Sequence, residues 1–68
     1  MITLQINGKK VVLDAPQPLV LYLESLGVNA RTVAVEHNGE IIQRSAFAAT
    51  ILKDGDTVEI VRMVGGGS

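Results

Sequence analysis

The sequence predicts an α+β domain, in which one main helix covers a mixed β-sheet of four to five strands. Apolar and polar residues alternate at residues 2–6, 32–37 and 57–63, and this period of two is typical of half-buried strands. Residues 19–26 instead carry leucines three and four positions apart, which is the spacing of a helix face. Runs of strands on both sides of a single helix favour the α+β class.

The chain begins with a predicted β-hairpin. Three apolar side chains share one face of its first strand, at residues 2–6. The dipeptide Asn7-Gly8 follows, and it favours a tight turn because both residues tolerate positive φ. The returning strand is predicted at residues 11–13, and the two prolines within residues 14–18 end it.

The main helix is predicted to begin near Pro18, which suits a first helical turn because its missing N–H costs no hydrogen bond there. The residues expected on its buried face are Leu19, Leu23 and Leu26, with Tyr22 beside them. Gly27 is expected to end the helix in the left-handed conformation. Val28 is then placed for the apolar contact that often follows such a cap.

The second half of the chain returns to extended structure. Its predicted segments are a strand at residues 32–37, a brief extended piece at 41–42, a short helical turn at 44–49, a tight turn at 53–56 and a final strand at 57–63. Asn38-Gly39 is a second turn signal. The short helical turn is expected to direct Phe47 inward. Val58 and Ile60 are expected on the buried face of the final strand.

Two hairpin-like regions around one helix describe a β-grasp, the ubiquitin-like fold. By analogy with that fold, the first and last strands are expected to lie parallel at the centre of the sheet. Residues 1–64 would form this one domain. Residues 65–68, Gly-Gly-Gly-Ser, are expected to form a flexible C-terminal tail, because glycine has no side chain to bury and the widest choice of backbone conformation.

Composition excludes several classes of function. The net charge is −1 and the basic residues are scattered apart from Lys9-Lys10, so the chain lacks the basic stripe of a nucleic-acid-binding protein. The absence of cysteine excludes thiolate nucleophiles and thiolate metal sites. No apolar run approaches the roughly 20 residues that a membrane span needs. The chain is predicted to be cytoplasmic, since no signal peptide is visible. No bound cofactor is expected, and the free chain is expected to be a monomer.

Four segments of the chain together resemble one known family. They are residues 6–9 (INGK), 33–42 (VAVEHNGEII), 54–61 (DGDTVEIV) and 64–67 (VGGG). In order and spacing they resemble the ThiS family, the small sulfur-carrier proteins of thiamine biosynthesis. The resemblance covers essentially all of residues 1–67.

The resemblance implies a chemical role for the tail. Family spacing counted from Asp54 places the terminal glycine at Gly67, while Gly65 and Gly66 would thread into the active sites of partners. An adenylyltransferase related to ubiquitin-activating enzymes would use ATP to adenylate the Gly67 carboxylate, and a sulfur donor would convert it to a thiocarboxylate. Thiazole synthase would take the sulfur, so the chain is expected to be a carrier and not an enzyme. Ser68 would block this carboxylate, and we expect it to be absent from the active form.

The final strand carries candidate docking residues. Val61 and Met63 fall on the face opposite the predicted core, so they are expected to be exposed near the tail, where two different enzymes must hold the carrier. The alternative is that they pack on the loop around Phe47. Arg62 is a candidate for pairing with an acidic group of a partner, although a solvated surface charge is the default.

The remaining polar residues are interpreted as structural. Asp54 and Asp56 suit a tight turn, and a cation site needs more oxygen ligands than these two provide. His37 has no cysteine or second histidine near it in sequence, so it is interpreted as a surface residue at a strand end. No metal site is therefore expected.

Two alternative functions remain open at this point. A sulfur carrier of another pathway, such as molybdopterin or cysteine synthesis, would share the tail chemistry. A non-covalent ubiquitin-like binding module would use a sheet face and leave the tail without a chemical role. The length of the chain and residues 33–42 favour the thiamine branch.

Overall fold

The sheet at the centre of the fold has five strands in the order β2-β1-β7-β4-β5. The structure, a computed structural model, describes residues 1–63. The strands are β1 (Ile2–Ile6), β2 (Lys9–Leu13), β4 (Val33–His37), β5 (Glu40–Ile42) and β7 (Thr57–Arg62). β1 and β7 run parallel, whereas the other neighbours are antiparallel. The predicted mixed sheet is therefore confirmed, and so is the parallel pairing of its first and last strands.

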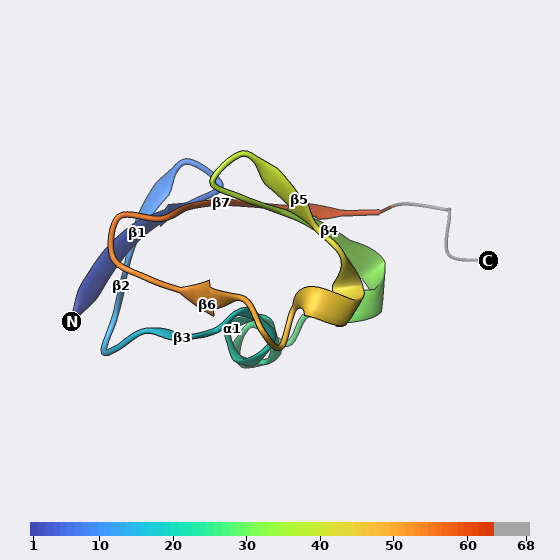
Figure 1. Cartoon of the computed structure of the whole chain (residues 1–68), viewed down its shortest axis with the longest axis horizontal. Coiled ribbons are helices and arrows are strands. Elements are labelled where there is room, and N and C mark those ends of the chain that lie inside the picture. The colour runs from blue at the N-terminus through green and yellow to red at the C-terminus, as the bar shows by residue number, and fades with distance from the viewer. Residues whose placement is uncertain (64–68) are drawn as a thin grey trace.

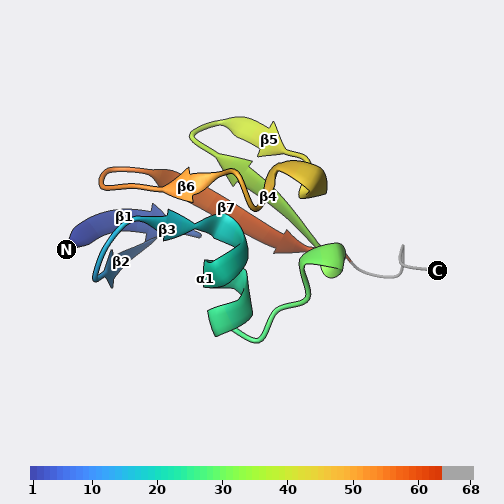
Figure 2. The same ribbon diagram turned by 60° about the horizontal axis from the view of Figure 1, so that its bottom comes forward.

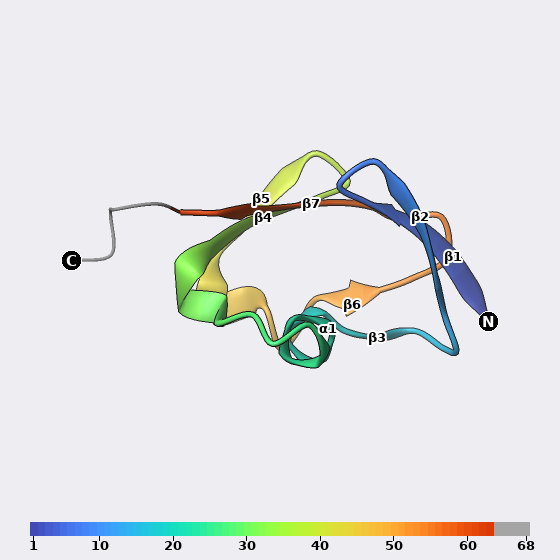
Figure 3. The same ribbon diagram turned by 180° about the vertical axis from the view of Figure 1, so that it is seen from behind.

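A second layer covers one face of this sheet (Figure 1). It holds α1 (Leu19–Ser25) and a ladder between β3 (Gln17–Pro18) and β6 (Ile51–Leu52). Two 3₁₀ turns, Ala30–Thr32 and Arg44–Ala46, lie in the connections to and from the sheet. Figures 2 and 3 show α1 and the two short strands on the same side of the sheet. Within residues 1–63, no helix or strand covers the opposite face.

Apolar side chains from the predicted strands and helix fill the space between the two layers. The buried core consists of Ile2, Leu4, Ile6, Leu19, Tyr22, Leu23, Val33, Val35, Phe47, Leu52 and Val58. Phe47 is directed inward from the short helical turn, as the sequence predicts. Leu52 is fully buried on β6, and this strand was not predicted because two residues are too few to show a period.

The end of α1 follows the predicted cap in one respect and departs from it in another. Gly27 has a φ of 73°, and its N–H donates to the Glu24 carbonyl, 3.0 Å away. The Val28 N–H donates to the carbonyl of Leu23 at 3.1 Å, which completes a Schellman motif. Leu26 was expected in the core and is instead 51% exposed. The expectation was wrong because the helix ends at Ser25 and Val28 packs against the core in its place.

Two asparagines hold β7 from its two sides. Asn7 and Asn38 both adopt a φ of 53° in the turns after β1 and β4. The Asn7 amide oxygen accepts from the Ile60 N–H at 2.7 Å, and its Nδ2 donates to the Ile60 carbonyl at 3.2 Å. The Asn38 amide oxygen accepts from the Thr57 N–H at 2.9 Å. The Asn7 amide therefore replaces a peptide group of a neighbouring strand and extends the pairing of β7 beyond the end of β1, whereas the Asn38 oxygen replaces one backbone carbonyl.

Replacing Asn7 by alanine is expected to lower the free energy of unfolding by about 1–3 kcal/mol, because two hydrogen bonds are lost and alanine is strained at positive φ. Urea unfolding would measure the change. Asn7→Gly separates the two causes, since glycine keeps the backbone conformation but lacks the amide. If Asn7→Gly were as stable as the unaltered chain, the hydrogen bonds to Ile60 would contribute nothing.

Candidate docking surface and the exit of the tail

β7 is the last strand before the predicted reactive tail. It lies between β1 and β4 and runs towards the end of the molecule opposite the N-terminus (Figure 1). Beyond its last residue the Met63 N–H still donates to the Thr32 carbonyl, 2.8 Å away, so backbone pairing reaches the last described residue. Gly65, Gly66 and Gly67, the predicted threading and modification sites, lie outside the described residues.

The three predicted docking residues do not share one surface. Val61 is 58% exposed and Met63 is 52% exposed, and the pleat of the strand puts both on the face away from α1. Phe47 lies in the core on the other side of the sheet, so neither residue packs around it. Arg62 belongs to the helix side, where it lines a hollow with Ile6, Asn7, Leu26, Val28, Val33 and Ile60. The structure thus groups Val61 with Met63 and separates Arg62 from them.

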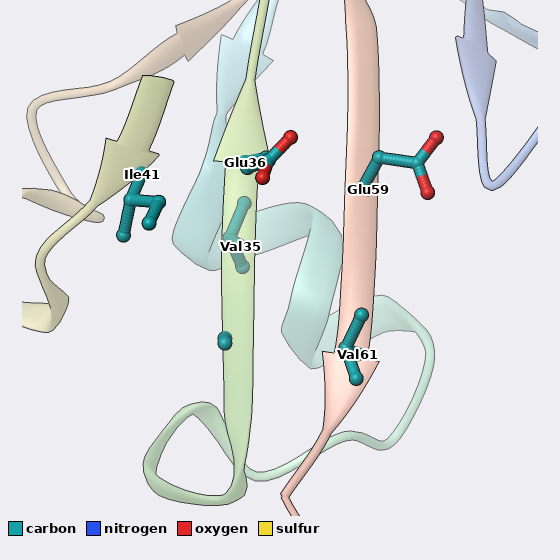
Figure 4. A pocket seen from close by; sticks show the side chains of 6 residues that line it. Val35, Glu36, Ile41, Glu59 and Val61 are labelled. Atoms are coloured by element: carbon teal, nitrogen blue, oxygen red, sulfur yellow. The ribbon is translucent and has the colours of Figure 1, made fainter. Parts of the chain in front are cut away.

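The open face of the sheet carries a shallow hollow of about 400 Å³ beside Val61 (Figure 4). Its lining residues are Ala34, Val35, Glu36, Ile41, Glu59 and Val61. Ile41 is 77% exposed, although it is a large aliphatic residue. The sequence did not identify Ile41, Glu36 or Glu59 as surface partners of Val61. The sequence alone does not give the register of the sheet. That register places Glu36 opposite both Ile41 and Glu59.

The opposite end of β7 holds a polar network centred on Asp56, which is only 8% exposed. His37 Nε2 lies 2.7 Å from Asp56 Oδ2, and Asn38 Nδ2 donates to Oδ1 at 3.1 Å. The backbone N–H of Lys53 donates to Oδ2 at 2.9 Å. The interpretation of His37 as a plain surface residue was therefore wrong, since it is largely buried and paired with the turn that precedes β7.

The electrostatics of this network stabilise the ionised form of Asp56. Burial acts to raise the pKa of the Asp56 carboxyl, but the hydrogen bonds from His37, Asn38 and Lys53, with the attraction of His37, lower it overall. An ionised carboxylate only accepts hydrogen bonds, so the short contact requires a proton on His37 Nε2. The network joins the turn after β4 to the turn before β7, at the end of β7 away from the tail, and we interpret it as structural.

Two possible features are not found in the part of the chain that the structure describes. Residues 1–63 contain no group of three or more side chains placed to hold a metal ion. No helix within this range is long and apolar enough to cross a membrane.

Comparison with known proteins gives one consistent result. A model of the ThiS family matches residues 3–67. The chain is similar to the sulfur carrier protein ThiS of Bacillus subtilis, with 38% identity over 65 residues that cover 94% of this chain and 98% of that protein. The crystal structure of the thiamine biosynthesis protein ThiS from Geobacter metallireducens superposes with a TM-score of 0.84 at 42% identity, covering 97% of this chain and 100% of the other.

A longer relative contains a region similar to this chain. It is a thiazole synthase of Paramagnetospirillum magneticum, which is 45% identical over 65 residues. The alignment covers 96% of this chain but 20% of that protein, so the chain spans about a fifth of its length. The family match, by contrast, runs from β1 through Gly67, and the fold of the Geobacter protein agrees with the sheet and helix described above. The chain therefore belongs to the ThiS family.

Proposed function

We propose that the chain carries sulfur as a thiocarboxylate on Gly67 and delivers it for formation of the thiazole ring of thiamine. The observation that carries this proposal is the family match, which continues past the last strand and includes Gly67. On this proposal residues 1–64 are the folded body, and residues 65–68 are a flexible segment that partners receive.

The chemistry has two steps, because a carboxylate is a poor electrophile. First, an oxygen of the Gly67 carboxylate attacks the α-phosphorus of ATP, which forms an acyl-adenylate and releases pyrophosphate. Hydrosulfide, or an equivalent sulfur donor, then attacks the carbonyl carbon. The carbon–oxygen bond to AMP breaks as the carbon–sulfur bond forms, which leaves a thiocarboxylate, AMP and a proton. The partner enzyme binds ATP and supplies the catalytic groups.

Glycine suits a segment that must enter two different active sites. It has no Cβ, so its backbone can approach other groups closely and adopt any φ. The four residues from Val64 to Gly67 reach about 13–14 Å when extended, which separates the reacting carbon from the folded body. On this proposal Gly65 and Gly66 pass through the entrance of the partner, while the exposed face at Val61 and Met63 rests against its surface.

Two partners follow from this chemistry. The first is an adenylyltransferase related to ubiquitin-activating enzymes, which loads the tail. The second is a thiazole synthase, which accepts the sulfur. The thiazole synthase of Paramagnetospirillum magneticum supports this choice, because it holds a region similar to this chain within one polypeptide. The proposal includes a cytoplasmic location and a free carrier that is a monomer.

The proposal is tested by measuring the intact mass of a chain ended at Gly67, after incubation with ATP, the cognate adenylyltransferase and a sulfur donor. The expected result is the mass increase that accompanies replacement of one oxygen by one sulfur. The same chain with Ser68 retained is the matched control, and it is expected to stay unloaded because its Gly67 carbonyl belongs to a peptide bond. An unchanged mass, with an enzyme that loads another carrier, would contradict the proposal.

Met63→Asp is expected to weaken binding to the adenylyltransferase about tenfold or more, because it introduces a charge into an apolar contact surface. The thermal midpoint should hardly change, since Met63 is 52% exposed. Leu21→Asp is a matched control, because Leu21 is a 49% exposed aliphatic residue on α1, in the other layer. Calorimetry of binding and of unfolding would check both. A large fall in the thermal midpoint would mean that Met63 belongs to the core.

A further inference from the structure

Two carboxylates lie directly opposite each other on the open face of the sheet. The antiparallel register of β4 and β7 pairs Glu36 with Glu59, and both residues are exposed. Like charges in directly opposite positions destabilise a sheet, so this pair opposes folding. The arrangement is unexpected in a small domain with a limited core.

Nothing within the chain neutralises this pair. The only ion pair among residues 1–63 is that of His37 with Asp56, and residues 64–68 contain no basic side chain. The lysine expected on the same face of the sheet, Lys10, lies on β2 and is separated from β7 by β1. The two negative charges are therefore available to an external cation.

Apolar side chains lie beside the two carboxylates. Ile41 lies opposite Glu36 on β5, and Val61 follows two residues after Glu59 on β7 (Figure 4). These four side chains line the hollow described above, on the face that α1 does not cover. A metal ion would gain nothing from the apolar part, whereas a protein side chain with a cationic head and an aliphatic stem would contact both parts.

We propose that this hollow receives an arginine or lysine side chain of the adenylyltransferase, with its stem against Ile41 and Val61 and its cationic head between Glu36 and Glu59. The inference rests on the function proposed above, and it identifies what recognises the carrier. An arginine fits best, because its planar guanidinium group can donate several hydrogen bonds to two carboxylates at once.

Charge complementarity favours the adenylyltransferase as the occupant. An enzyme that binds a triphosphate concentrates arginine and lysine around its nucleotide site. Glu59 precedes Gly67 by eight residues, which is at most about 26–29 Å of extended chain. The acidic pair is complementary in charge to basic side chains on the surface that leads to such a site, and this complementarity would speed association and orient the carrier.

The test uses the chain ended at Gly67 and measures its binding to the adenylyltransferase for Glu36→Gln and Glu59→Gln. Each is expected to weaken binding about tenfold, because the cationic head loses one carboxylate. Each should also reduce the dependence of affinity on salt, and should leave the thermal midpoint equal or higher because the repulsion is removed. Glu24→Gln is the matched control, since it removes the same charge from an exposed position on α1 and should change affinity less than about twofold.

The outcomes separate this inference from the proposed function. If the chain ended at Gly67 loads sulfur normally, and both glutamine variants bind as tightly as that chain without the substitutions, the inference is wrong and the function stands. A fall in the thermal midpoint of either variant would show that the pair stabilises the sheet, which also overturns the inference. Weaker binding to thiazole synthase alone would overturn the choice of occupant. A chain ended at Gly67 that neither binds nor loads would overturn both proposals.

Discussion

Deleting residues 66–68 is expected to give a chain that cannot be loaded with sulfur, unlike the chain ended at Gly67, and to leave the thermal midpoint within about 2 °C of its original value. Loading fails because the deletion removes the carbon atom on which the thiocarboxylate would form. Stability is kept because the buried core of the described structure lies entirely within residues 2–58, from Ile2 to Val58. Intact mass after the loading reaction and a calorimetric unfolding scan would measure the two effects on the same sample.

A deletion of Ser68 alone is the matched control for this experiment. It keeps Gly67 as the terminal residue, so loading should be present, and it changes the chain length by one residue. A deletion of residues 66–68 that unfolds several degrees lower would show that the tail contributes to packing. Sulfur loading on the shortened chain would show that Gly67 is not the site of modification.

Asp56→Ala is expected to lower the free energy of unfolding by about 2–4 kcal/mol, or the thermal midpoint by roughly 10–20 °C. The substitution removes the acceptor for three donors, which belong to His37, Asn38 and the Lys53 backbone. It leaves those donors in a part-buried environment, where an unsatisfied hydrogen-bonding group is costly. Asp14→Ala is the matched control, because Asp14 is exposed, and it should cost little.

The same network predicts how stability changes in acid. The pKa of Asp56 is lowered in the folded chain, so between the folded and unfolded pKa values the unfolded chain binds more protons. The contribution of Asp56 to the free energy of unfolding is therefore fully present above the ordinary aspartate pKa of about 3.9. It is lost as the pH falls from there through the pKa of Asp56 in the folded chain. Urea unfolding from pH 6 down to pH 2 (a range of about four units) should show a shallower acid decline for Asp56→Asn. Equal slopes would mean that Asp56 is not the group responsible.

The strands and turns of the hairpins were predictable because each depends on residues close together in the sequence. The alternation at residues 2–6 and 33–37 reports which side of a strand is buried, and this is a local property. The turns at Asn7-Gly8 and Asn38-Gly39 follow from the tolerance of these residues for positive φ. The β3–β6 ladder was not predictable, since it joins two pairs of residues more than thirty positions apart.

The polar network and the open-face hollow were not predictable for a related reason. Asp56 occurs in an Asp-Gly-Asp sequence that suits an ordinary turn, and nothing local shows that His37 lies against it. Glu36 and Glu59 become neighbours only when the register of β4 and β7 is fixed. The exposed position of Val61 was inferable from alternation alone, whereas its neighbour Ile41 required the pairing of β5.

The clamping of β7 by Asn7 and Asn38 has a mechanical consequence. Backbone hydrogen bonds cross between antiparallel strands at right angles to the strand axis, so a pull on the tail along β7 shears them together instead of opening them one by one. The amide of Asn7 adds two such bonds near the carboxyl-terminal end of β7, on the side where β1 has ended. A force applied along the carboxyl-terminal end of β7 is therefore shared among many hydrogen bonds, and the sheet is expected to keep its shape under that force.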